Sequence, residues 1–135
     1  MAWEACRMKI RNTGATETTW GTEIIWCSSE QYCGKLLVFK ASGVKTAIQF
    51  QKLRHKSWFV HEGTFIVRWI DTDTGVAKEN VIKQGDVIAV PPLKPFQVEA
   101  LVPGSVLMES GSAEYENDVC KLSPDEVINL QPQEL

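Results

Sequence analysis

Short runs of residues rich in Val, Ile, Phe and Trp recur along most of the chain, and turn-forming residues separate them. Runs of this composition and length are typical of β-strands. The predicted strands span residues 22–27, 35–40, 46–51, 57–61, 64–70, 80–83, 87–90, 96–101 and 105–109. Many short strands with close turns predict an all-β protein, built as a sandwich or a barrel.

The connections between these runs carry residues that favour turns. Residues 62–63 (Glu-Gly) join two strands tightly, residues 71–75 (Asp-Thr-Asp-Thr-Gly) predict a polar hairpin tip, and residues 103–104 (Pro-Gly) mark a further turn. Residues 91–92 are both proline and must end a strand, because proline lacks the N–H that a β-ladder needs. These breaks set the strand boundaries given above.

Length, composition and charge place the chain among ordinary single domains. It has 135 residues, of which 44% are hydrophobic and 23% are charged, which is enough to bury a substantial core. The 14 basic residues are dispersed among 17 acidic ones, and the net charge is -3. A nucleic-acid partner is therefore not expected, because phosphate binding needs a concentrated excess of Lys and Arg.

Hydrophobic residues are nowhere concentrated enough to suggest a membrane segment. No run approaches the roughly 18 to 20 consecutive apolar residues that cross a bilayer. The first residues, 1–7 (MAWEACR), also lack the charged start and apolar run of a secretory leader. We therefore expect a cytoplasmic protein without membrane contact.

Two glycine-anchored segments resemble the motifs of the cupin family. Residues 43–51 (GVKTAIQFQ), followed by 56–63 (KSWFVHEG), resemble the first motif, whose pattern is a glycine, a His-x-His pair, a glutamate and a closing glycine. Residues 85–96 (GDVIAVPPLKPF) resemble the second motif, in which a histidine directly follows the last proline. The resemblance covers about residues 19–122 and implies a single-domain cupin, that is, a double-stranded β-helix or jelly-roll-like barrel.

All four metal-ligand positions of these motifs are substituted. The resemblance places Gln49 and Gln51 at the histidine pair, Lys56 at the glutamate and Phe96 at the last histidine. Imidazole and carboxylate bind divalent metals, whereas an amide oxygen is a weak neutral donor and a phenyl ring donates nothing. The Lys56 ammonium adds repulsion where the family pattern supplies attraction. We therefore expect neither a metal nor another cofactor.

Within the cupins, the chain looks most like the small single-barrel group related to type II mannose-6-phosphate isomerases and other sugar-linked cupins. The segments that carry this likeness are residues 20–23 (WGTE), 32–35 (YCGK) and 117–119 (NDV). In that group the metal positions the hydroxyls and carbonyl of the sugar and stabilises charge during proton transfer. The missing ligands therefore argue against the isomerase activity itself.

Local alternation and the resemblance disagree on the direction of one strand. Alternation pairs Ile48 with Phe50 on one face and would turn Gln49 and Gln51 toward water. The resemblance requires the opposite, with both glutamines facing the barrel interior. It leaves Ile48, Phe50 and also Phe59 on the outer surface, where they need cover.

Two covers for this outer surface are considered. The first is a second copy of the chain, and we predict a homodimer because cupins commonly pair through such sheets. The second is the N-terminal segment, residues 1–18, whose Trp3, Met8 and Ile10 could lie across the same sheet. The two covers are compatible with each other.

The C-terminal tail, residues 123–135, is predicted to lie outside the barrel. Ser123 followed three residues later by Glu126 is typical of a capped helix start. The tail is therefore expected to contain a short helical turn over residues 127–130, docked against the barrel.

An inward direction of the glutamines predicts a pocket near the barrel mouth. Its candidate residues are Gln49, Gln51, Lys56, Trp58 and Phe96. Amides and an aromatic face suit a sugar, and an ammonium suits a carboxylate or phosphate. The alternative is that these residues simply fill the space of the lost metal site.

Other ionisable residues are not assigned to the pocket. By strand parity His55 and His61 face away from the interior. A nucleophilic or basic role for Lys56 would need burial or a cationic neighbour to lower its pKa, and neither can be seen in a sequence. The direction of Glu109 is left open. No catalytic residue is assigned.

The favoured function is a metal-free, non-catalytic binding or interaction module for a small sugar-like molecule. The alternative is a sugar-phosphate isomerase-like or epimerase-like enzyme that has rebuilt its site around other residues. A third possibility is a structural or regulatory dimer with a filled barrel, which predicts no pocket large enough for a ligand.

Overall fold

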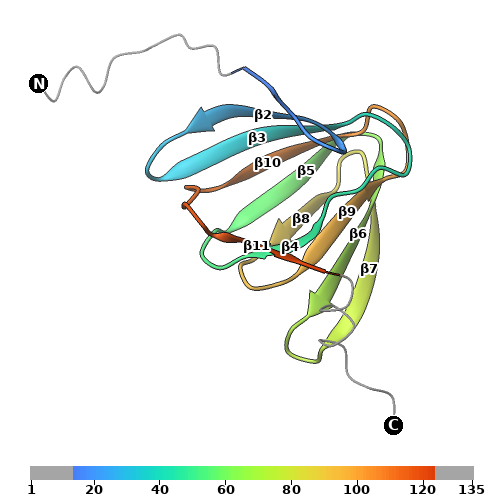
Figure 1. The fold of residues 1–135 in the computed structure, drawn as a ribbon. Helices are drawn as coiled ribbons and strands as arrows, with labels where there is room; N and C mark the ends of the chain where they lie inside the picture. Colours follow the sequence, from blue (N-terminus) through green and yellow to red (C-terminus); the bar gives the residue numbers. More distant parts are fainter. Residues whose placement is uncertain (1–13, 124–135) are drawn as a thin grey trace, which may run out of the picture.

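The computed structural model of the protein describes residues 14–123, which form two antiparallel β-sheets that face each other (Figure 1). The six-stranded sheet has the order β1 (Thr16–Glu17), β2 (Gly21–Ser28), β3 (Tyr32–Phe39), β10 (Val106–Ser112), β5 (Lys56–Glu62) and β8 (Val87–Val90). The five-stranded sheet has the order β11 (Val119–Leu122), β4 (Ile48–Gln51), β9 (Phe96–Ala100), β6 (Thr64–Asp71) and β7 (Val76–Lys83). The predicted all-β, jelly-roll-like barrel is confirmed.

All nine predicted strands are present, and two further strands were not predicted. These are β1, which lies inside the predicted N-terminal segment, and β11, which pairs with β4. The strand β7 is also four residues longer at its start than the predicted run at 80–83. Its full length pairs with β6, but Ile82 is its one buried residue, so no apolar alternation marks it. Hairpin pairing with β6 across the turn at residues 71–75 extends this strand, and the apolar pattern of β7 does not report it.

The turn at Gly63 passes the chain from one sheet to the other. It follows β5 in the six-stranded sheet and precedes β6 in the five-stranded sheet. Its φ of 82° lies in the left-handed region, and a Cβ at this position would come within 1.9 Å of Ser105 Oγ. Glycine is therefore required here by conformation and by space.

The predicted hairpin tip at residues 71–75 joins β6 to β7. The N–H of Gly75 donates to the carbonyl of Asp71 at 2.6 Å, and the N–H of Asp73 donates to Asp71 Oδ1 at 3.0 Å. This is the polar turn expected from the sequence.

Aromatic and aliphatic side chains from both sheets form the core. Phe39 stacks on Trp20 with ring centroids 4.6 Å apart and meets the edge of Phe65 at 5.0 Å. Phe39, Phe65, Val60 and Leu107 are fully buried, and Trp20 is a partly buried residue packed against them. Burial of this apolar surface is the main stabilising contribution, and it fixes which strand faces point inward.

The apolar residues expected on one outer surface lie on two different sheets. Ile48 and Phe50 are on β4 of the five-stranded sheet, whereas Phe59 is on β5 of the six-stranded sheet. The expectation that they share one patch is therefore wrong. Phe59 instead belongs to a row of register-matched apolar residues that crosses the six-stranded sheet: Ile24, Leu36, Met108, Phe59 and Val87.

This apolar row is where the predicted homodimer would bury surface. The alternative cover by Trp3, Met8 and Ile10 lies outside the described residues. The homodimer stays a prediction. Light scattering of the purified chain should give a dimer mass that halves on the Phe59→Glu substitution, whereas a wild-type chain that is monomeric at all concentrations would contradict it.

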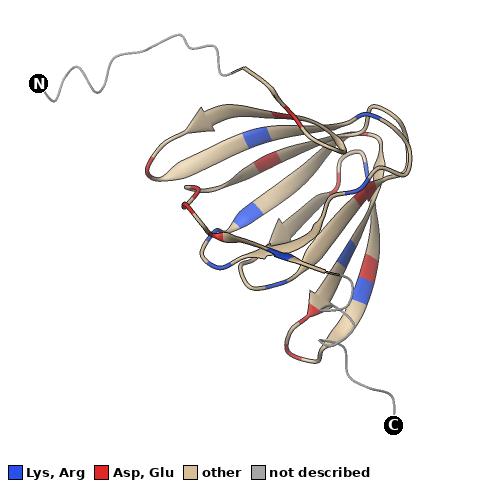
Figure 2. Cartoon of the chain, in the orientation of Figure 1, with Lys and Arg blue, Asp and Glu red and all other residues tan. Residues whose placement is uncertain are grey.

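Charged residues of both signs are interspersed over the described strands (Figure 2). Within residues 14–123, no helix is long and apolar enough to cross a membrane. The expected cytoplasmic location and the expected lack of a nucleic-acid partner stay predictions. So does the helical turn over residues 127–130, which lies outside the described residues.

Candidate functional site

A cavity of about 550 Å³ opens between the two sheets. All five residues predicted to form a pocket line it: Gln49, Gln51, Lys56, Trp58 and Phe96. The inward direction of the two glutamines therefore follows the cupin-like spacing and not local alternation. That these residues bind a ligand stays a prediction.

Strand pairing explains why these residues meet. Gln49 on β4 and Phe96 on β9 are direct cross-strand partners, so their side chains share the inner face of the five-stranded sheet. Lys56 and Trp58 are two residues apart on β5 and share the inner face of the opposite sheet. Trp58 meets Phe96 across the interior, edge to face, with ring centroids 5.1 Å apart.

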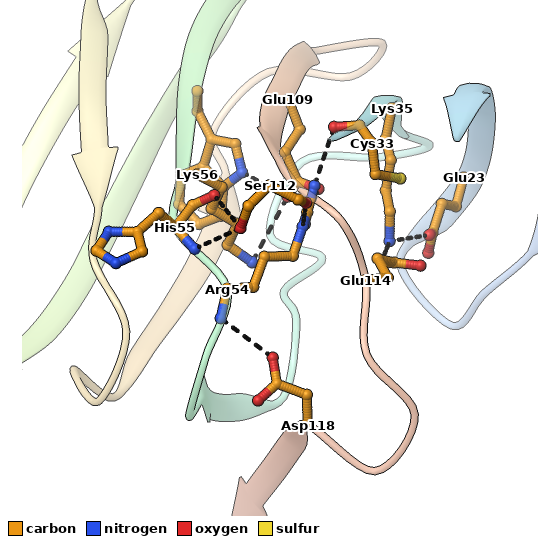
Figure 3. Close-up of polar contacts among 11 residues, drawn as sticks. Glu23, Cys33, Lys35, Arg54, His55, Lys56, Glu109, Ser112, Glu114 and Asp118 are labelled. Carbon is orange, nitrogen blue, oxygen red and sulfur yellow. Dashed lines mark hydrogen bonds and ion pairs between the residues drawn. The ribbon is translucent and has the colours of Figure 1, made fainter. Parts of the chain in front are cut away.

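A buried network of charges lies at one end of the cavity, centred on the Glu109 carboxylate (Figure 3). Arg54 Nη1 donates to Glu109 Oε2 at 2.7 Å, and Trp58 Nε1 donates to Glu109 Oε1 at 2.9 Å. Lys56 Nζ lies 3.5 Å from the same Oε1. Arg54 is 1% exposed and Glu109 is 4% exposed, so the carboxylate depends on these partners and not on water.

The remaining donors of Arg54 bind main-chain carbonyls of neighbouring segments. Nε donates to the carbonyl of Ser112 at 2.8 Å, and Nη2 donates to the carbonyl of Cys33 at 3.1 Å. The fork of this guanidinium thus joins β3, β10 and the segment before β5. Arg54 therefore holds these segments and the Glu109 carboxylate together.

Sequence reasoning did not single out Arg54 and left the direction of Glu109 open. A usable signal existed for Glu109, because it stands two residues from the fully buried Leu107 on β10 and must share its inward face. No comparable local signal marks Arg54. It lies in the loop between β4 and β5, outside any alternating run.

The electrostatics of the network give Glu109 an unusual acidity. Burial alone would raise its pKa, but the cations of Lys56 and Arg54 and the hydrogen bond from Trp58 outweigh burial and lower the pKa from 4.5 to about 2. The carboxylate is therefore ionised throughout the physiological range.

Ionised Glu109 is expected to stabilise the protein at neutral pH and to lose this effect in acid. Since its folded-state pKa lies below the unfolded value, the contribution is full above about pH 4.5 and fades as the pH falls toward 2. The shift corresponds to about 3 kcal/mol in the free energy of unfolding. Urea unfolding between pH 7 and pH 2.5 should show this loss. The Glu109→Gln variant should lose less stability over the same interval, and an identical pH dependence in both proteins would contradict the assignment.

Lys56 occupies an apolar wall of the cavity. Its side chain is 8% exposed, and Nζ lies 4.6 Å from the ring centroid of Phe96 and 5.3 Å from that of Trp58. Burial lowers the pKa of Lys56, the Glu109 carboxylate opposes this, and the Arg54 cation adds to it. Both conditions for an activated amine, burial and a cationic neighbour, are thus present.

Gln51 presents a polar atom without a partner in the described part of the protein. The residue is 7% exposed, and its Oε1 is buried without a hydrogen bond from any described group. A buried acceptor left in this state costs about 1 to 3 kcal/mol. A hydrogen-bond donor inside the cavity would remove this cost.

A second ion cluster lies on the cavity wall formed by β2 and β3. Lys35 Nζ lies 2.8 Å from Glu23 Oε1 and also contacts the Glu114 carboxylate (Figure 3). Burial would lower the pKa of Lys35, but its hydrogen bonds with Glu114 and Glu23 raise it. The cluster keeps this side of the cavity polar.

The cavity residues do not fit the metal that cupin motifs ordinarily bind. The four ligand positions present two amides, an ammonium and a phenyl ring, and both oxygens of nearby Glu109 are already bonded. Within residues 14–123, no three His, Cys, Asp or Glu side chains gather into a group that could hold a metal ion. His55 and His61 are exposed and do not line the cavity, in line with their parity.

Solved structures similar to this one include three kinds of protein. Oxalate decarboxylase from Bacillus subtilis is 18% identical with a TM-score of 0.72, and the match covers 90% of this chain and 36% of that chain. The capsular polysaccharide assembling protein CapF from Staphylococcus aureus is 12% identical with a TM-score of 0.71, covering 84% of this chain and 33% of that chain. KdgF from Halomonas sp. is 15% identical with a TM-score of 0.64, covering 77% of this chain and 91% of that chain.

These neighbours are cupin-fold proteins, and at such low identity the likeness shows the fold alone. This chain has the cupin fold and spans about a third of the length of the oxalate decarboxylase and CapF chains. No protein-family model matches the sequence, and a search of curated proteins finds no match. The sugar-linked subgroup therefore rests on the motif resemblance.

Proposed function

We propose that this cupin-fold protein binds a small polar, sugar-like molecule in its interior cavity without the help of a metal ion. The observation that carries the proposal is the Gln51 Oε1 acceptor, buried without a described partner on the wall of a cavity of about 550 Å³. Cavities of about 300 to 1,000 Å³ are typical of small-molecule sites. A filled barrel would leave no such space, which argues against a purely structural role.

The lining has the chemistry of a sugar site. The amides of Gln49 and Gln51 can each accept from one hydroxyl and donate to another. Trp58 and Phe96 supply the apolar surface that the C–H face of a sugar ring prefers. One structural neighbour is named as a capsular polysaccharide assembling protein, which is in keeping with a sugar-related role.

The Gln51→Leu substitution is expected to weaken ligand binding about tenfold, because it removes one hydrogen bond made inside the cavity. Folding should not suffer, because the substitution also removes an unsatisfied buried acceptor. Calorimetric titration with neutral monosaccharides, sugar acids and sugar phosphates is the measurement. The control is Gln84→Leu, at an exposed glutamine that does not line the cavity. Equal affinities of Gln51→Leu and wild type, or no binding of any sugar, would contradict the proposal.

A sugar-phosphate isomerase-like or epimerase-like activity is the second candidate. The observation in its favour is Lys56, an amine whose burial lowers its pKa and so readies it to accept a proton. Incubation with aldose and ketose phosphates in deuterated water, with and without added metal, distinguishes the two candidates. Deuterium incorporation that disappears in a Lys56→Arg variant would favour the enzyme. No deuterium incorporation by the wild-type protein would favour the binding module.

A further inference from the structure

The Lys56 amine is held loosely by its surroundings. Within residues 14–123, its one polar contact is with Glu109 Oε1 at 3.5 Å. A firm charged hydrogen bond between ammonium and carboxylate is shorter, at about 2.7 to 2.9 Å. The neighbours that lie over Nζ are the rings of Phe96 and Trp58. Lys56 also lines the cavity, so this weakly held nitrogen is within reach of a molecule bound there.

The loose contact arises because Glu109 is already bound by other donors. Arg54 occupies Oε2 at 2.7 Å, and the Trp58 indole occupies Oε1 at 2.9 Å. Arg54 bonds the carboxylate directly at 2.7 Å, whereas Lys56 lies 3.5 Å from it. Burial and the Arg54 cation both lower the pKa of Lys56, which raises the share of the neutral, nucleophilic amine.

We infer that Lys56 is a nucleophile that binds an open-chain sugar, or a similar small hydroxyaldehyde, covalently as an imine inside the cavity. This inference rests on the proposed function and deepens it, because it names the reacting group of the ligand as an aldehyde or ketone. Reducing sugars present this group in their open-chain form. Their hydroxyls would then meet the amides of Gln49 and Gln51 on the opposite wall.

The reaction is balanced without any oxidant or reductant. The neutral amine attacks the carbonyl carbon, a C–N bond forms and the carbonyl oxygen takes a proton, which gives a carbinolamine. The C–O bond then breaks, and both amine hydrogens leave with the oxygen as one water molecule. The imine nitrogen can take up a proton, and the ionised Glu109 at this distance would stabilise the resulting cation. Hydrolysis reverses every step, so binding is reversible.

Borohydride trapping of the full-length chain tests the inference. The protein is incubated with D-glyceraldehyde at neutral pH and reduced with sodium borohydride, which converts an imine into a stable secondary amine, and modified lysines are counted by peptide mass spectrometry. Lys56 should be trapped at least tenfold faster than the exposed Lys52 and Lys83. Trapping of Lys56 no faster than these two would overturn the inference.

Two further arms separate this inference from the proposed function. Glycerol and longer alditols carry the hydroxyls of a sugar but no carbonyl, so calorimetry with them reports non-covalent binding alone. If alditols bind but Lys56 is not trapped, the inference of an imine is wrong and the proposed function still holds. If Lys56 is trapped and excess alditol does not slow the trapping, the inference of an imine holds but the proposed sugar site is wrong. The Lys56→Arg variant should give no trapped product. If this variant does not fold, the protection of Lys56 by excess alditol is measured in the wild-type protein in its place.

Discussion

Replacing Arg54 with methionine is expected to lower the free energy of unfolding by about 3 to 5 kcal/mol, because it removes one partner of a buried ion pair. The Glu109 carboxylate would then remain buried with its Oε2 unbonded. The carbonyls of Cys33 and Ser112 would lose their donors as well. Urea denaturation followed by tryptophan fluorescence measures the loss.

The matched control is the Arg68→Met substitution. Arg68 also bonds two acidic residues, Glu79 and Glu99, but its side chain is 36% exposed. An exposed pair of this kind contributes about 0 to 1 kcal/mol. If Arg54→Met destabilised the protein no more than Arg68→Met does, the buried network would not be the support of the site described above.

Replacing Asp118 with alanine is expected to lower the free energy of unfolding by about 5 kcal/mol, since it removes three hydrogen bonds to a charged acceptor that contribute about 1.5 to 3 kcal/mol each. The Asp118 carboxylate is 3% exposed and accepts three consecutive main-chain N–H groups, from Lys52 at 2.9 Å, Leu53 at 2.9 Å and Arg54 at 3.3 Å. It therefore fixes the loop that delivers Arg54 and Lys56 to the cavity. The same urea titration measures the loss, and ligand affinity should fall with it.

Asp86 provides the comparison for Asp118. Its carboxylate accepts a single main-chain N–H, from Lys83 at 2.9 Å, near the turn after β7. The Asp86→Ala substitution should cost about 1 kcal/mol, in line with one partly exposed hydrogen bond. Equal losses in the two variants would show that the Asp118 loop is not specially dependent on its carboxylate.

The residues that define the cavity were predictable because motif spacing carries information that alternation does not. In β4 one face carries Ile48 and Phe50 and the other carries both glutamines, so alternation gave Gln49 and Gln51 the wrong direction. The glycine-anchored spacing placed them correctly. The turns at residues 62–63 and 71–75 were predictable for a local reason, since Gly, Asp and Thr favour those conformations wherever the segment lies.

The network beneath the cavity could not be predicted, because its partners are joined only by tertiary structure. Arg54 and Glu109 are 55 residues apart in the chain. They meet because β10 pairs with β5, and the pairing register places Glu109 opposite Trp58. Asp118 reaches the same loop from a segment 64 to 66 residues away. The shift in the pKa of Lys56 follows from this assembly and from burial, so it has no signature in the sequence.

Native mass spectrometry combined with elemental analysis, on protein purified without a chelator, tests the account most directly. The central claim is that amides and an amine have replaced the metal-binding groups of the cupin motifs and now hold an organic molecule. We expect far less than one zinc, iron, nickel or manganese ion per chain, together with a small polar organic molecule whose occupancy is lower in Gln51→Leu than in the wild type. Near-stoichiometric metal in the purified protein would contradict it.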